Sequence, residues 1–210
     1  MDIGPVPSPQ VDATGNFTIT GVAPGRYALR GNVIVAAQGA GGAAGAQGGF
    51  AALGGRGGGA GGAAATGGWI LKSAMVNGVD TLDFPLDIKP NENLNGAILT
   101  FTDKSQELSG TLQDATGQPT SDYTIILFAA DNRFWTPLSR RILSTRPGTD
   151  GKFTFRNLPA GQYRLTAVTD AEQGEWFDPA YLSQIGAASL AVTIGEGEKK
   201  VQDIRLAGGF

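Results

Sequence analysis

The sequence predicts an all-β protein with two tandem β-sandwich domains, the first of which is incomplete. One pattern is written twice, as "TGNFTITGVAPGRYALR" over Thr14–Arg30 and as "DGKFTFRNLPAGQYRLT" over Asp150–Thr166. Apolar residues alternate with polar ones between Gly- and Pro-containing turns along most of the chain, and helical periodicity is nearly absent. The 210 residues suit two domains of about 100 residues each.

Each copy of the pattern predicts a β-hairpin. In the first copy, Phe17 and Ile19 alternate with threonines, "APG" supplies a turn, and Tyr27 and Leu29 continue the alternation. The second copy repeats this order around "LPAG". A period of two places alternate side chains on one buried face, which is typical of a half-buried strand.

A complete seven-stranded sandwich is predicted for residues 105–210. Its strands are expected in "ELSGTLQDA", "YTIILFAAD", "RRILSTRPG", the two halves of the second copy, "SLAVTIGE" and "KKVQDIRLA". One short helix is expected in "DPAYLSQIGAA", where Asp178 supplies an N-cap and Pro179 the first helical residue.

Residues 1–104 are predicted to form a sandwich that lacks its opening strands. After the first copy, strands are expected in "WILKSAMVNG", "LDFPLDIKP" and "LNGAILTFTDK". Only the proline-rich "MDIGPVPSPQVD" precedes the copy, and it offers at most one edge strand. Val6 and Val11 of this segment are therefore candidate assembly contacts. The missing strands are expected either upstream in the same polypeptide or from another molecule.

Residues 38–68 form an insertion that is about half glycine and a third alanine. A disordered surface loop is the first interpretation, because such a sequence has little to bury and a high ordering entropy. The alternative is extended backbone that packs closely against neighbouring molecules, with Phe50 and Leu53 as its apolar anchors.

The segments "ELSGTLQDATGQP" and "DGKFTFRNLPAGQYRL" resemble the carboxypeptidase regulatory-like domain, a transthyretin-like or prealbumin-like sandwich related to B-type repeats of bacterial surface adhesins. Over Trp69–Leu206 the chain is also similar to the C-terminal end of large exported bacterial proteins that carry such domains in tandem. The resemblance implies two transthyretin-like sandwiches, a non-catalytic role as spacer, adhesion or carbohydrate-associated module, and secretion or surface display. The insertion and the missing first strands depart from the family pattern.

Composition excludes several functions. The chain contains neither Cys nor His, so thiolate nucleophiles, disulfides, imidazole metal sites and imidazole-based triads are absent. The net charge of -3 comes without a Lys/Arg cluster, which argues against nucleic acid. No run of about 18 apolar residues indicates a membrane span, and no signal peptide is recognisable. We expect no cofactor, no metal and no enzymatic activity.

Four aromatic residues are candidate contacts for a sugar or a protein partner, namely Trp135, Trp176, Phe177 and Tyr181. Their rings can stack on sugar faces, or they can close the ends of the sandwich as part of its core. The acidic residues of "AEQGEWFDPAYL" are expected to be ordinary loop acids rather than a catalytic pair. The acidic turns "TDKS", "DATG" and "GTDG" lack the ligand density of a calcium loop.

The favoured interpretation is a non-catalytic extracellular structural protein, a surface fibre or filament subunit that self-associates through β-strand complementation. The alternative is a carbohydrate-binding or spacer module of a larger exported enzyme or receptor, with a glycan as its partner. A third interpretation is the regulatory domain of a peptidase whose catalytic part lies elsewhere.

Overall fold

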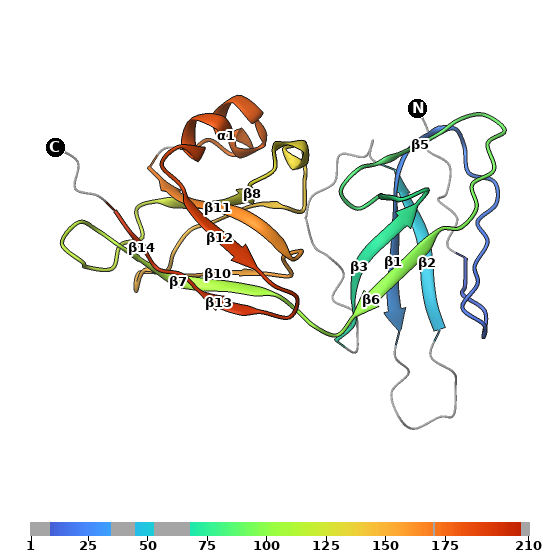
Figure 1. Ribbon diagram of the computed structural model, residues 1–210, viewed down its shortest axis with the longest axis horizontal. Helices are drawn as coiled ribbons and strands as arrows, with labels where there is room; N and C mark the ends of the chain where they lie inside the picture. The colour runs from blue at the N-terminus through green and yellow to red at the C-terminus, as the bar shows by residue number, and fades with distance from the viewer. Residues whose placement is uncertain (1–8, 35–44, 53–67, 170, 207–210) are drawn as a thin grey trace, which may run out of the picture. The chain divides into compact units, whose positions relative to one another are not determined.

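The structure is a computed structural model that describes residues 9–34, 45–52, 68–169 and 171–206. The chain divides into two compact units, Met1–Asp103 (unit 1) and Lys104–Phe210 (unit 2), which are described separately. Strands dominate both units, and the all-β prediction is confirmed (Figure 1).

Unit 2 is a sandwich of two sheets. One sheet has the order β10-β7-β13, with β14 also paired to β7, and the other has the order β12-β11-β8-β9. The strands are β7 (Glu107–Gln113), β8 (Thr124–Ala129), β9 (Ile142–Thr145), β10 (Lys152–Arg156), β11 (Gly161–Val168), β12 (Leu190–Ile194), β13 (Lys199–Val201) and β14 (Ile204–Arg205). The short helices are η1 (Asn132–Phe134), η2 (Glu175–Phe177) and α1 (Pro179–Gly186).

The core of unit 2 comes from alternate residues of facing strands. Leu108 and Leu112 of β7 are fully buried in the same cluster as Leu127 of β8 and Leu165 of β11. Removing each such side chain from water contributes about 1.5–3 kcal/mol. The alternation in the sequence therefore reports which face of each strand is inside.

Helix α1 covers the outer face of the β8–β11 sheet (Figure 1). Its N-cap is Asp178, whose side chain accepts a hydrogen bond from the Ala180 N–H at 2.8 Å, and Pro179 is its first residue. Leu182 is fully buried in a second cluster with Ile126 and Phe128 of β8, which we call the outer cluster. The predicted helix is confirmed, including its cap.

The predicted hairpin over Asp150–Thr166 is wrong, although both of its strands exist. β10 pairs with β7, whereas β11 pairs with β8 and β12, so the "LPAG" turn carries the chain from one sheet to the other. Leu158 is buried at this corner, and the Tyr163 hydroxyl donates to the Pro159 carbonyl at 2.6 Å. Alternation identifies the buried face of each strand but not its partner, so a crossover and a hairpin look alike in sequence.

Unit 1 also contains two sheets, with orders β2-β1-β5 and β4-β3-β6. In Figure 1, β3 and β6 lie in front of β1 and β2. The strands are β1 (Gly25–Ile34), β2 (Gly45–Ala52), β3 (Ile70–Val76), β4 (Val79–Asp80), β5 (Leu86–Ile88) and β6 (Ile98–Thr102). Among the described residues its core cluster has three buried members, Leu29, Ala74 and Val76, against twelve in the main cluster of unit 2.

Gly110 in the middle of β7 is expected to be irreplaceable. A Cβ at this position would lie 2.0 Å from the Gln202 carbonyl oxygen and 2.8 Å from the Phe153 ring. Gly110→Ala should therefore destabilise unit 2 by about 1–3 kcal/mol, as overpacking does, measured by thermal unfolding. Gly186→Ala is the control, because its Cβ would meet Phe128 at an ordinary 3.8 Å. Equal stability of the two variants would contradict the packing described here.

Candidate functional site

The two units share local structure over the repeated pattern. The Tyr27 hydroxyl donates to the Ala23 carbonyl at 2.9 Å, as the Tyr163 hydroxyl does to Pro159 in unit 2. The likeness continues beyond the insertion. The Lys89 N–H donates to the Glu92 carboxylate at 2.8 Å, and the Gly195 N–H donates to the Glu198 carboxylate at 2.6 Å. The segments of unit 1 can therefore be matched to those of unit 2.

In unit 2, β7 forms backbone hydrogen bonds with the strands on both of its sides. On one side β10 pairs with it antiparallel, and the Leu112 N–H donates to the Gly151 carbonyl at 2.8 Å. On the other side β13 pairs with it parallel, and the Gln202 N–H donates to the Ser109 carbonyl at 2.8 Å. β7 is thus the strand that joins the beginning and the end of the domain.

In unit 1 no described strand pairs with the segments that correspond to β10 and β13, although β3 pairs with β6, which directly follows the second of them. The segment matching β10 is Phe17–Thr20, and the segment matching β13 and its approach to β14 is Leu94–Ala97. Among the described residues, neither segment forms a strand or a backbone hydrogen bond to another segment. We use the name acceptor position for the place that a strand equivalent to β7 would take between these two segments.

Apolar side chains beside the acceptor position are only partly covered. Phe17, Ile19, Leu94 and Ala97 all pack against the buried cluster around Leu29 and remain half-buried. Their counterparts in unit 2 include Phe153 and Phe155, each 4% exposed.

The Gly/Ala-rich insertion contributes a strand, contrary to its interpretation as a disordered surface loop. β2 pairs antiparallel with β1 over eight residue pairs, from Tyr27↔Ala52 to Ile34↔Gly45. It takes the side of β1 that β8 takes beside β11, so that Leu29↔Phe50 corresponds to Leu165↔Leu127. Backbone hydrogen bonds suffice for such pairing, which is why a segment with little side-chain volume could not be recognised as a strand from its composition.

The other predicted assembly residues are placed as follows. Val11 is half-buried, and the backbone of Phe50 faces Leu29 across the β1–β2 pair. Val6 and Leu53 lie outside the described residues. The assembly role of all four residues stays a prediction.

Trp135 is built into the fold of unit 2. Its Nε1–H donates to the Ala129 carbonyl at 2.8 Å, and its ring packs edge-on against Phe128 with centroids 5.7 Å apart. Both contacts hold the loop after β8 against the outer cluster. A ring held by these two contacts has little freedom to rearrange for a ligand. This geometry favours a role of Trp135 in the core over stacking against a sugar.

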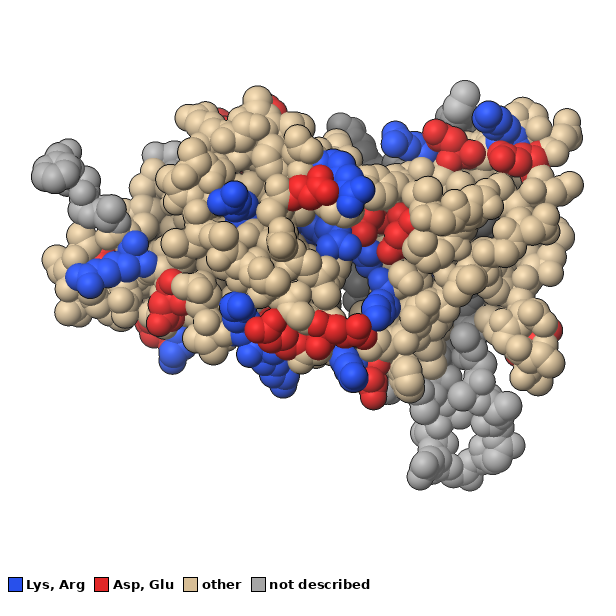
Figure 2. Space-filling view, viewed as in Figure 1, with Lys and Arg blue, Asp and Glu red and all other residues tan. Residues whose placement is uncertain are grey.

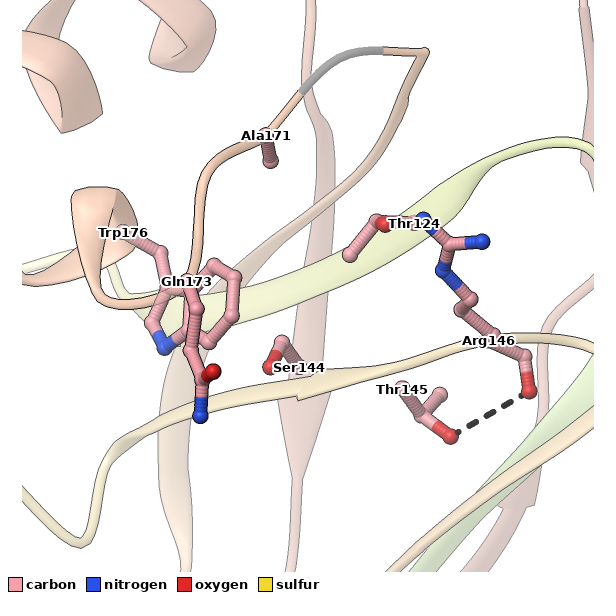
Figure 3. A pocket seen from close by; sticks show the side chains of 7 residues that line it. All are labelled: Thr124, Ser144, Thr145, Arg146, Ala171, Gln173 and Trp176. Atoms are coloured by element: carbon pink, nitrogen blue, oxygen red, sulfur yellow. Dashed lines mark hydrogen bonds between the residues drawn. The ribbon is translucent and has the colours of Figure 1, made fainter.

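Trp176 lies at an open pocket of about 250 Å³. The lining residues are Thr124, Ser144, Thr145, Arg146, Ala171, Gln173 and Trp176. Figure 3 shows Trp176 and Gln173 at one end of the pocket, and Thr124 and Arg146 at the other. An indole face beside hydroxyl, amide and guanidinium groups is chemically suited to a polar ring such as a sugar. Of these residues the sequence pointed only to Trp176, because the others come from three separate parts of the chain: β8 (Thr124), the end of β9 (Ser144, Thr145, Arg146) and the loop after β11 (Ala171, Gln173).

Phe177 and Tyr181 pack in the outer cluster with Trp176 and do not line the pocket. The Trp176 and Phe177 rings are tilted, with centroids 6.3 Å apart. Burial, with a smaller contribution from the Glu175 carboxylate, raises the pKa of the Tyr181 hydroxyl. These two residues thus belong to the cluster in which Trp176 packs.

The acidic residues near the aromatic cluster bind backbone groups. Glu175 accepts from the Glu172 N–H at 3.0 Å, and Asp178 caps α1. In the "DATG" turn, the Thr116 hydroxyl, followed by the Gln118 N–H, lowers the pKa of Asp114. Such acids are occupied in shaping their own turns. Within the described ranges, no three acidic residues come together as a group that could hold a metal ion.

Charges are sparse on the face shown in Figure 2, where small groups of both signs are separated by uncharged surface. A phosphate-binding face would require clustered Lys and Arg. The helices of the described chain are all too short or too polar to cross a membrane.

Residues 107–207 match the family model of the carboxypeptidase regulatory-like domain. The match spans β7 through β14, which is unit 2 nearly in full. No curated protein matches the chain significantly.

Several solved structures share a low level of similarity with the chain. The backbone protein of group B streptococcus pilus 2b is 12% identical with a TM-score of 0.35, covering 97% of this chain and 78% of that one. BcpA, the major pilin subunit of Bacillus cereus, is 11% identical with a TM-score of 0.34, covering 77% of this chain and 43% of that one. A dioxygenase domain from Streptomyces sp. SirexAA-E is 16% identical with a TM-score of 0.30, covering 49% and 79%. At these scores the likenesses carry no argument about function.

Replacing Trp135 should reveal its structural role. Trp135→Ala is expected to lower the free energy of unfolding of unit 2 by about 3 kcal/mol, because it empties part of the outer cluster. Trp135→Phe should cost less, since mainly the hydrogen bond to Ala129 is lost. Leu138→Ala is the control in the same loop, where the side chain is 78% exposed. Chemical denaturation measures all three, and an unchanged Trp135→Ala variant would contradict the assignment.

The raised pKa of Tyr181 predicts a loss of stability in alkali. The neutral hydroxyl is favoured in the folded state, so its contribution is fully present below the ordinary value of 10.0 and is lost as pH rises through the folded-state pKa. Guanidinium unfolding at pH 8 to 11 should show a steeper decline for the native chain than for Tyr181→Phe. If the free energy of unfolding falls equally with pH in both proteins, the pKa of the Tyr181 hydroxyl is not raised by folding.

Proposed function

Because residues 107–207 form a carboxypeptidase regulatory-like domain, we propose that this chain is a non-catalytic extracellular structural protein. Its finer role is that of a surface fibre or filament subunit assembled through β-strand complementation. The observation that carries the proposal is the acceptor position in unit 1, where neither Phe17–Thr20 nor Leu94–Ala97 has a described partner strand.

Two physical costs favour filling the acceptor position. Unpaired backbone N–H and C=O groups beside an apolar core are unfavourable unless water or another strand satisfies them. The half-buried side chains of Phe17, Ile19 and Leu94 add apolar surface that a strand would cover. A strand from another molecule meets both needs at once, and a head-to-tail repetition of that contact propagates as a filament.

The chemistry of the chain supports a non-catalytic role. It has no Cys or His, and Glu175 and Asp178 are engaged with backbone N–H groups. Surface display rests on the resemblance to domains of exported proteins.

A self-complemented chain tests the proposal. A second copy of residues 106–114, joined ahead of Met1 by a flexible linker, should occupy the acceptor position and raise the unfolding midpoint of unit 1 by about 5 °C or more. It should also suppress association, which light scattering and negative-stain microscopy measure.

The matched control carries the same extension with aspartate in place of both leucines of the copied strand. This version should neither stabilise unit 1 nor suppress association. If the native chain stays monomeric at high concentration and neither extension changes its stability, strand complementation is wrong.

The Trp176 pocket favours a second candidate function, a carbohydrate-binding or spacer module of a larger exported protein. Glycan-array binding by the native chain, lost in Trp176→Ala with retained circular dichroism, is the expected result for this candidate. Trp135→Phe is the control, because Trp135 does not line the pocket. Absence of binding to any glycan would leave only the spacer role of this alternative.

A further inference from the structure

The pocket beside Trp176 has the chemistry to select an acidic sugar. This inference deepens the second candidate function, carbohydrate binding, and rests on it. We infer that the pocket binds one pyranose ring that carries a carboxylate, that is, a uronic-acid residue of an acidic glycan. Arg146 is the residue that selects the carboxylate, and Trp176 is the residue that holds the ring.

The charge of the pocket favours an anion. Among the described residues that line it, Arg146 is the one with a charged side chain. No hydrogen bond or ion pair engages its guanidinium in the part of the chain that the structure describes. A guanidinium presents parallel N–H groups in one plane, and these match the two oxygens of a carboxylate.

The glutamates of the neighbouring loop do not occupy the pocket. Glu172 and Glu175 are both absent from its lining. The Glu175 carboxylate accepts a hydrogen bond from the Glu172 N–H at 3.0 Å, so it shapes its own turn. The Arg146 guanidinium is thus available to an anionic group of the ligand.

The local sequence fixes the backbone of Arg146. This residue follows the last residue of β9 and precedes Pro147, which is buried. A residue before proline is restricted to extended backbone, so the base of the Arg146 side chain is positioned although the side chain is exposed. The Thr145 hydroxyl also donates to the Arg146 carbonyl at 3.5 Å (Figure 3). Ligand binding therefore does not have to order this backbone.

The ring-binding group lies at the other end of the pocket (Figure 3). Trp176 is half-buried in the outer cluster, where its ring is tilted against that of Phe177. An indole held in this way offers apolar aromatic surface at a fixed place, which suits the C–H face of a pyranose. The separation of Trp176 from Arg146 matches a ligand with an apolar face at one end and a carboxylate at the other.

Hydroxyl and amide groups complete the lining. Thr124, which is 6% exposed, begins β8, and Ser144 and Thr145 end β9 beside it, since Ile125 pairs with Thr145. Gln173 adds an amide near Trp176 (Figure 3). Groups of these types donate and accept hydrogen bonds, as sugar hydroxyls do, whereas an isolated carboxylate would need only Arg146.

The size of the pocket suits a single ring. Its volume of about 250 Å³ lies below the range of about 300–1,000 Å³ that is typical for drug-sized ligands. Because the pocket is open, the remaining residues of a longer glycan can stay outside it.

Calorimetric titration of the full-length chain tests the inference. The probes are tetrasaccharides that contain galacturonate, glucuronate or mannuronate, the methyl ester of each, and a glucose tetrasaccharide. An ester keeps the ring and removes the charge, so it is a matched control. We expect saturable binding of at least one acidic probe and at least about tenfold weaker binding of its ester.

Three variants assign the two roles. Arg146→Gln should weaken binding of the acidic probe about tenfold and leave binding of the ester unchanged. Trp176→Ala should weaken binding of both probes. Arg156→Gln makes the same change in charge at a side chain 73% exposed that does not line the pocket, and it should alter neither. Circular dichroism checks that all three variants are folded.

The outcomes separate this inference from carbohydrate binding in general. Equal binding of acid and ester, lost in Trp176→Ala, would overturn the selection of a carboxylate and leave carbohydrate binding in place. Binding of sulfated glycans alone, or equal binding of a glutamate-rich peptide, would overturn the inferred ligand class. No binding of any probe, acidic or neutral, would overturn both. A preference for the acid that disappears in Arg146→Gln and persists in Arg156→Gln supports the inference.

Discussion

The interior strand of a sheet must satisfy backbone groups along both of its edges, and in unit 2 this role falls to β7. It hydrogen-bonds to β10 on one side and to β13 and β14 on the other, so the first and last parts of the domain depend on it. Its inward residues, Leu108 and Leu112, reach the core from the centre of the sheet. Gly110 between them lets the Gln202 carbonyl and the Phe153 ring approach the backbone closely.

Unit 1 repeats the tyrosine hydrogen bond and the glutamate turn of unit 2, but its sheets contain different strands. Beside β1 the Gly/Ala-rich insertion supplies β2, which takes the side that β8 takes in unit 2. Backbone pairing alone can hold such a strand, since its sequence offers little side-chain volume. No described strand pairs with Phe17–Thr20 or Leu94–Ala97, and Phe17 and Ile19 stay half-buried.

The two tryptophans of unit 2 have different roles because of where they lie in the fold. Trp135 is bound to the Ala129 carbonyl and to the Phe128 ring, so it contributes to stability. Trp176 belongs to the same outer cluster but also lines the open pocket. Trp135 and Trp176 look equivalent in the sequence, but their roles differ because the surrounding loops cover them differently.

The sequence by itself determined the strands of unit 2, the buried face of each, the capped helix at Asp178 and the repeat that relates the two units, because these features rest on local periodicity and turn chemistry. Only the tertiary structure decided which strands pair, that β10 and β11 belong to different sheets, that the insertion provides β2, and which residues join Trp176 at the pocket. Strand pairing depends on contacts between residues far apart in the chain, and the alternation of apolar and polar residues along one strand does not indicate its partner.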